Sequence, residues 1–256
     1  MPPSLALAAE LAPPGFAIAP HGIHLDVADS RTARTAAVEF TSGSEEGTLQ
    51  FFDAVLPECR RMIDFGGFIG FTSLYAAAQG ARVECFEPSQ ANTALLEANL
   101  AANPRLARRI RLHRRAIGAR AAADVLAETG LDPETLLKID IEGAEYEVVP
   151  AIAALLARHR PFLHVSFHPF NVVRGADEYL NQVARLRGAL AVAEAVAPYR
   201  HMYFHTEQGW TRIDQRDRLS LLAQYLLKPK PMAGAAAPQY GFTDSLALSE
   251  VALPLG

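Results

Sequence analysis

Met62-Ile63-Asp64-Phe65-Gly66-Gly67-Phe68-Ile69-Gly70-Phe71-Thr72-Ser73 is the stretch that decides the predicted fold. Its apolar start predicts a buried strand, its glycines a tight turn, and its end the start of a helix. Because glycine has no Cβ, this backbone can turn sharply and let a ligand approach closely. The next predicted strand, Arg82-Val83-Glu84-Cys85-Phe86, is followed by Glu87 and Pro88. A glycine turn after one strand and an acid after the next are typical of nucleotide-binding α/β sheets, in which the acid holds a ribose.

The residues of the glycine turn favour one class of nucleotide. A dinucleotide site holds a pyrophosphate at its glycine turn and helix N-terminus. Here Asp64 stands at the strand end, where its carboxylate would repel a phosphate, and the glycine spacing differs from G-x-G-x-x-G. A carboxylate at this place suits S-adenosylmethionine (SAM), which offers an ammonium, a sulfonium and a ribose. The alternative is that Asp64 only caps the following loop through local hydrogen bonds. The predicted cofactor contacts are Asp64, Gly66, Gly67, Gly70, Thr72, Glu87, Pro88, Ala116, Ile117 and Asp140.

A third segment, Leu136-Leu137-Lys138-Ile139-Asp140-Ile141-Glu142-Gly143-Ala144-Glu145-Tyr146-Glu147, is typical of a strand running into a helix. Together with "IDFGGFIGFTS" and "VECFEPSQANTALLEANL", it makes residues 45 to 215 resemble the FkbM-type family of SAM-dependent methyltransferases. The resemblance implies a class I methyltransferase that makes an O-methyl product on a sugar or small secondary metabolite. The family usually carries a small residue and then Asn where this chain has Gly67 and Phe68. Either the Asn contact comes from elsewhere, or Phe68 packs against the ligand.

Alternation of strands and helices predicts an α/β fold with a Rossmann-like, mostly parallel sheet and right-handed crossovers. We expect seven strands, helices on both faces, and an antiparallel edge hairpin near residues 202–213. The predicted organisation is an N-terminal extension over 1–44, a SAM-binding domain over 45–230 and a Pro/Ala-rich tail over 231–256. The extension is a candidate substrate cap.

Residues on the predicted carboxyl ends of the strands are the candidates for catalysis, because ligands bind there in open α/β sheets. A hydroxyl acceptor needs a base that takes its proton as the new bond forms. His168 and Asp140 are the candidates, since imidazole titrates near neutral pH. Glu142 has two interpretations, a substrate contact or a helix cap. The rim residues expected to converge are Asp64, Glu87, Ala116, Ile117, Asp140 and His168.

Three neighbouring residues have structural interpretations. Lys138 shares a strand face with Asp140, and a buried lysine needs a partner, so we expect it to pair with Glu142 or Glu145. Glu145 itself is interpreted as structural, and His164 as a core histidine.

Composition narrows the functional classes. The chain has 256 residues, half of them hydrophobic, and a net charge of −4, so nothing electrostatic favours nucleic acid. The histidines and carboxylates match no standard zinc spacing, so no metal is expected. No run of about eighteen apolar residues and no basic leader is present, so we expect neither a membrane span nor a signal peptide, but a cytoplasmic protein. The expected partner is a small-molecule acceptor. The oligomeric state is open, with a homodimer as one option.

Two alternatives to the methyltransferase reading stay open. One is an NAD(P)-dependent oxidoreductase or epimerase on a similar sheet. The other is a non-catalytic SAM-binding scaffold, which the unusual Phe68 keeps in view.

Overall fold

The computed structural model describes residues 16–18, 23–25, 45–172, 175–206, 209–214 and 244–255. The chain divides into two compact units, residues 1–116 and 117–256. Most of the predicted extension over 1–44, residues 231–243 of the predicted tail, and the hairpin-turn residues Glu207 and Gln208 lie outside the described residues.

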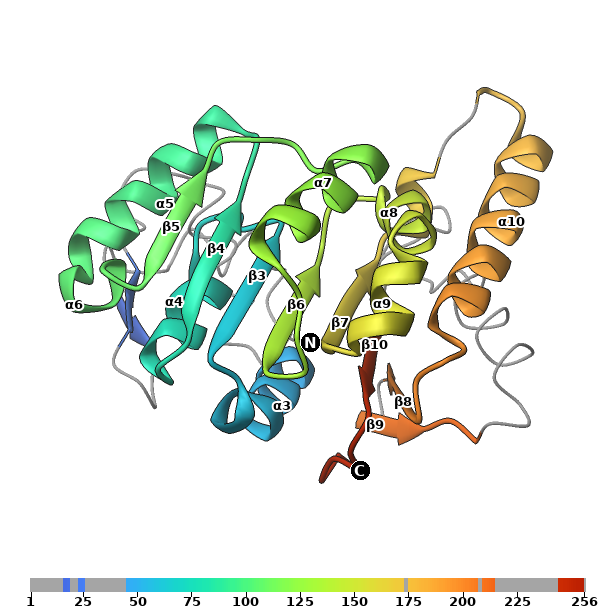
Figure 1. The fold of residues 1–256 in the computed structure, drawn as a ribbon. Helices are drawn as coiled ribbons and strands as arrows, with labels where there is room; N and C mark the ends of the chain where they lie inside the picture. The colour runs from blue at the N-terminus through green and yellow to red at the C-terminus, as the bar shows by residue number, and fades with distance from the viewer. Residues whose placement is uncertain are drawn as a thin grey trace, which may run out of the picture. The chain divides into compact units, whose positions relative to one another are not determined.

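The first unit is built around three parallel strands, β3 (Arg61–Phe65), β4 (Arg82–Phe86) and β5 (Ile110–His113), in the order β5-β4-β3 (Figure 1). Met62 and Ile63 of β3 are buried, as expected for a parallel strand that is covered on both faces. In β4, Val83, Cys85 and Phe86 are buried, whereas Glu84 is partly exposed. The register pairs Asp64 with Cys85 and Phe86 with His113, so that the carboxyl ends of the strands lie side by side.

Helices and a short hairpin complete the first unit. They are α3 (Glu46–Val55), η1 (Leu56–Glu58), α4 (Phe71–Ala78), α5 (Gln90–Ala102), α6 (Pro104–Ala107) and the antiparallel pair β1 (Phe16–Ile18) and β2 (Ile23–Leu25). Ser89 caps α5, because its hydroxyl accepts the N–H of Asn92 at 3.3 Å.

The second unit contains five strands in the order β6-β7-β10-β8-β9. The strands β6 (Thr135–Ile139) and β7 (Phe162–Phe167) are parallel, whereas β8 (His201–Thr206), β9 (Gly209–Arg212) and β10 (Asp244–Ser249) pair antiparallel to their neighbours. The helical elements are α7 (Ala119–Thr129), α8 (Glu145–Ala151), α9 (Ala153–His159), η2 (Pro169–Asn171) and α10 (Glu178–Val196).

The α/β fold and the antiparallel edge are confirmed, but the strand count is not. Beside the β1–β2 pair, the units contain three and five strands, one more than the seven predicted. The additional strand is β10, which lies inside the predicted tail and pairs with both β7 and β8. Leu246 and Leu248 are fully buried there. The sequence did not predict this strand, because its short apolar run follows a Pro- and Ala-rich segment.

None of the helices in the described ranges is long and apolar enough to cross a bilayer.

Candidate functional site

The loop that follows β3 is fastened to the end of β4. The N–H groups of Gly66 and Gly67 both donate to the carbonyl oxygen of Phe86 at 3.0 Å. Gly66 and Gly70 have φ angles of 93° and 89°, which favour glycine. A Cβ on Gly67 would lie 2.2 Å from the Cys85 sulfur, so a side chain there would displace packed atoms. The backbone of this loop therefore depends on its glycines.

Glu87, directly after β4, binds the same loop. Its Oε2 accepts the N–H of Phe68 at 2.9 Å, and its Oε1 accepts the N–H of Ser89 at 2.9 Å and Nδ2 of Asn92 at 3.2 Å. The residue is only 5% exposed. Phe68 has a φ of 48°, a left-handed conformation that is uncommon outside Gly, Asn and Asp. The Asn usual in the FkbM family suits this conformation, which explains the preference in physical terms.

Asp64 is fully buried and its carboxylate serves the start of α4. Its Oδ2 accepts hydrogen bonds from Thr72 Oγ1 at 2.9 Å and Ser73 Oγ at 2.7 Å. Two predicted cofactor contacts, Asp64 and Thr72, are thus joined to each other. This is the capping arrangement that the sequence left open, and a carboxylate near a helix N-terminus is favoured by the helix dipole.

The remaining cofactor candidates of the first unit lie near the same strand ends. Pro88 and Ala116 are exposed. His113, which the sequence analysis did not select, stacks its ring on Phe86 with centroids 4.4 Å apart, and its Nε2 lies 2.5 Å from Glu84 Oε2. The position of His113 at the carboxyl end of β5 is the sequence signal that could have identified it. Ile117, the first residue of the second unit, is buried.

In the second unit, Glu145 organises the loop that follows β6. Its Oε1 accepts the N–H of Ile141 at 2.8 Å, and its Oε2 accepts the N–H of Gly143 at 2.8 Å. Oε1 also lies 2.9 Å from Nδ1 of His168. Because Oε1 of Glu145 already accepts a backbone N–H, it also acts as the acceptor toward His168, and Nδ1 of His168 is the donor. The structural interpretation of Glu145 agrees with these contacts.

The three predicted catalytic residues lie close together in this unit. His168 Nε2 is 3.6 Å from Asp140 Oδ1 and 3.8 Å from Glu142 Oε1. Lys138 Nζ lies 3.4 Å from Asp140 Oδ2, a partner that the prediction of Glu142 or Glu145 did not include. Alternation of side chains along β6 makes Asp140 the nearer carboxylate on the same face.

The surroundings of His168 change its titration. Burial alone would lower the pKa of His168, but the hydrogen bond that His168 donates to Glu145 and the charges of Asp140, Glu145 and Glu142 outweigh it and raise the pKa to about 9. The ring is therefore an imidazolium at neutral pH, whereas the sequence suggested titration near 7. His168 must lose its proton before it can accept another.

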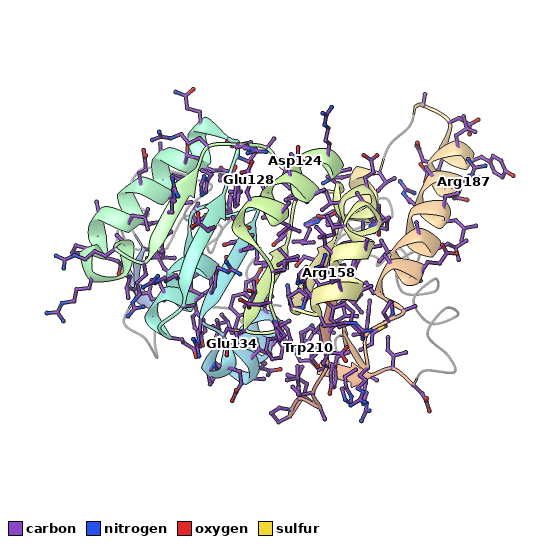
Figure 2. The ribbon with its side chains drawn as sticks, viewed as in Figure 1. Asp124, Glu128, Glu134, Arg158, Arg187 and Trp210 are labelled. Carbon is purple, nitrogen blue, oxygen red and sulfur yellow. The ribbon has the colours of Figure 1, made fainter. Side chains whose placement is uncertain are left out.

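His164 has the opposite character. It is fully buried on β7, and its ring lies 6.3 Å from that of Trp210 on β9, which is labelled in Figure 2. Burial, with the nearby charge of Lys138, lowers the pKa of His164 to about 3, so the ring is neutral. The prediction of a core histidine is confirmed.

Asp140, Glu145 and His168 also offer ligand atoms within 4.8 Å of one another, a spacing that a metal ion could use. Both oxygens of Glu145 already accept backbone N–H groups. The Glu145 carboxylate in this cluster is therefore already engaged by hydrogen bonds of the protein.

One segment of this chain matches a known family, and the fold is similar to that of several solved structures. Residues 111–194 match the family described as "Methyltransferase FkbM domain". The fold is similar to that of the bifunctional kinase-methyltransferase WbdD, with 13% identity, 96% of this chain and 46% of that chain covered, and a TM-score of 0.51. Further similar structures are an O-methyltransferase from Bacillus cereus in complex with SAH (15% identity, 80% of each chain, TM-score 0.46) and methyltransferase FkbM from Methylobacillus flagellatus KT (16% identity, 86% and 55%, TM-score 0.39).

No curated protein sequence gives a significant match. The matched family segment contains β6, the loop clamped by Glu145, and His168. Residues 111–194 are therefore similar to an FkbM methyltransferase domain, and this match supports the class of SAM-dependent methyltransferases that the sequence predicts.

Proposed function

We propose that this protein transfers the methyl group of SAM to a hydroxyl group of a small organic acceptor. The observation that carries the proposal is the Glu87 carboxylate, which holds the glycine loop after β3 from the end of the adjacent strand. A strand-end acid combined with a glycine turn suits the ribose and the amino-acid end of an adenosyl ligand.

The residues of the first unit fit SAM. A carboxylate has about four acceptor positions, and three of those on Glu87 are taken by Phe68, Ser89 and Asn92. The position left on Oε2 suits one ribose hydroxyl. We propose that Gly66, Gly67 and Gly70 let the methionine end approach, supported by the helix start that Asp64 and Thr72 organise. In the same proposal Pro88 and Ala116 flank the nucleoside. The other two predicted cofactor contacts, Ile117 and Asp140, belong to the second unit.

When bound, SAM supplies a methyl group that its sulfonium makes electrophilic. The tasks of the chain are to orient the acceptor, to exclude water and to take up the hydroxyl proton. We propose His168 as the base, because Glu145 fixes Nδ1–H and leaves Nε2 as the accepting atom. Asp140 and Glu142 lie nearest to Nε2, and they stabilise the imidazolium that forms. Asp140 is the alternative base.

Calorimetric titration tests the cofactor assignment. We expect binding of SAM and of S-adenosylhomocysteine, and no heat with NAD+. Binding of NAD+ without SAM would instead support the oxidoreductase or epimerase.

Incubation with radiolabelled SAM and a panel of hydroxyl compounds tests turnover. We expect label in at least one acceptor. SAM binding without transfer to any compound would favour the scaffold.

A further inference from the structure

A groove of about 750 Å³ lies within the second unit, between the loop after β6, η2 and α10. Its size is in the range of small-molecule sites, about 300–1,000 Å³. On α10, Leu180, Val183, Ala184 and Ala191 recur at helical spacing and line one wall. Tyr146 of α8 lines the opposite wall. The walls are therefore mainly apolar.

Close packing and hydrogen bonds shape this groove in advance. A Cβ on Gly188 would lie 2.9 Å from the Tyr146 ring, so α10 contacts α8 directly at that point. The buried Arg185 joins α10 to η2, because its Nε donates to the carbonyl oxygen of Pro169 at 2.8 Å. Its Nη1 also pairs with Glu178 at 2.6 Å in the first turn of α10. The wall formed by α10 is thus anchored.

One end of the groove is polar and adjoins the catalytic candidates. Glu142 lines the groove, and its Oε2 accepts Nδ2 of Asn171 at 2.8 Å. The other oxygen, Oε1, lies 3.8 Å from His168 Nε2. Glu142 has a φ of 56°, a strained backbone conformation of the kind that clusters at functional sites. The Glu142 carboxylate therefore lines the groove and also lies beside His168.

We propose that this groove binds the methyl acceptor, and that the acceptor is a hydroxylated amphiphile. Its hydroxyl-bearing end lies at Glu142 and its apolar body lies along α10. A bare sugar would place hydroxyl groups against apolar walls without replacing their hydrogen bonds to water. The lining contains two acidic residues, Glu142 and Glu147, and one basic residue, Arg187, which is labelled on α10 in Figure 2. This excess of negative charge disfavours an acceptor with an anionic head.

This inference rests on the proposed function, but its first test is independent of SAM. The probes are octyl β-D-glucoside, kept below its micelle-forming concentration, and methyl β-D-glucoside, which has the same sugar without the chain. We expect the octyl compound to bind at least about tenfold more tightly by calorimetry, because its chain is removed from water. Equal affinities for the two glucosides would overturn the proposal.

Variants on α10 locate the binding. Leu180, which lines the groove, is 53% exposed, and Tyr179, which does not line it, is 72% exposed. Leu180→Glu should weaken binding of octyl glucoside at least about tenfold, because a charge then faces the chain. Tyr179→Glu adds the same charge one residue away and should leave binding unchanged. Equal effects of the two variants would contradict the placement.

A second pair of variants tests the middle of the groove. Ala184→Trp should fill it and abolish binding of octyl glucoside, whereas Leu186→Trp adds the same ring at an exposed position outside the lining. SAM affinity, measured in parallel, should equal that of the wild type in all four variants. Wild-type protein that binds octyl glucoside but not SAM would overturn the proposed function, whereas binding of SAM with equal glucoside affinities would overturn only the groove.

Discussion

The loops after β3 and β6 both contain a residue in the left-handed conformation, but the carboxylates that hold them come from different places in the sequence. Each has one non-glycine residue in the left-handed region, Phe68 at 48° and Glu142 at 56°, and each is held by a carboxylate that accepts backbone N–H groups. In the first loop that carboxylate is Glu87, 19 residues from Phe68. In the second it is Glu145, in the first turn of the helix that the loop enters.

The two carboxylates differ in how many hydrogen-bond acceptor positions they keep free for a ligand. Glu145 is fully buried, and its partners are two backbone N–H groups and His168, all from the protein. Glu87 keeps one acceptor position on Oε2. Asp64 resembles Glu145, since it is buried and bonded to Thr72 and Ser73. In this chain, two acids beside glycine turns, Asp64 and Glu145, therefore hold parts of the protein.

The largest effect is expected from His168, which the second loop positions. His168→Gln should slow methyl transfer by at least about 100-fold, because general-base catalysis is worth about 10²–10⁴. SAM affinity should stay near that of the wild type. A normal rate in this variant would remove His168 as the base and leave Asp140.

The pH profile of the wild type sharpens the same point. Because the pKa of His168 is raised to about 9, the neutral imidazole is a minority form at pH 7. The transfer rate should rise about tenfold per pH unit and level off near pH 9. The same shift predicts that folding stability linked to His168 is complete below about pH 6.5 and is lost as the pH rises toward 9. A flat rate profile between pH 7 and 9 would contradict the assignment.

Glu145 tests whether the second loop depends on its clamp. Glu145→Ala should lower the free energy of unfolding by about 3–5 kcal/mol, because two part-buried N–H groups and the buried imidazolium lose their partner. The exposed Glu147, in the same turn of α8, is the matched control, and Glu147→Ala should change stability little. Urea denaturation measures both. Equal stability losses would mean that the carboxylate of Glu145 is not the clamp.

Glu87 tests the ligand-binding half of the comparison. Glu87→Ala should weaken SAM binding at least about tenfold, or roughly 1.4 kcal/mol. Asp64→Ala should do the same through the start of α4. Glu97→Ala is the control, since that exposed carboxylate on α5 contacts Arg114. If calorimetry gives unchanged affinity for both Glu87→Ala and Asp64→Ala, the cofactor site has been misplaced.

The smallest effect is expected at Phe68. Phe68→Asn should raise the free energy of unfolding by about 1 kcal/mol, because Asn tolerates the left-handed conformation better. Phe68→Ala removes the ring and keeps the strain, so it should not stabilise the protein. A stability of Phe68→Asn at or below that of Phe68→Ala would show that the ring, and not the backbone, decides this position. SAM titration of both variants shows whether the ring contacts the ligand.

Much of the fold and part of the site could be predicted from local patterns. The strand, glycine turn and helix around Asp64, the strand before Asp140, and the position of His168 after β7 were all predicted correctly. The strand β10 was missed, because its partners β7 and β8 lie far away in the sequence. The contact of Lys138 with Asp140 was not predicted, because the choice among three nearby carboxylates depends on side-chain direction.

By itself the sequence determined which segments become strands and where the loops between them turn, because apolar runs and glycines act over a few residues. It also carried the FkbM resemblance, which rests on contiguous segments. Only the tertiary structure decided which carboxylates accept hydrogen bonds from backbone N–H groups and which keep an acceptor position for a ligand. It also decided the charge of His168, because burial and the distances to several carboxylates set the pKa of that ring. Residues that are far apart in the chain come within these distances only after folding.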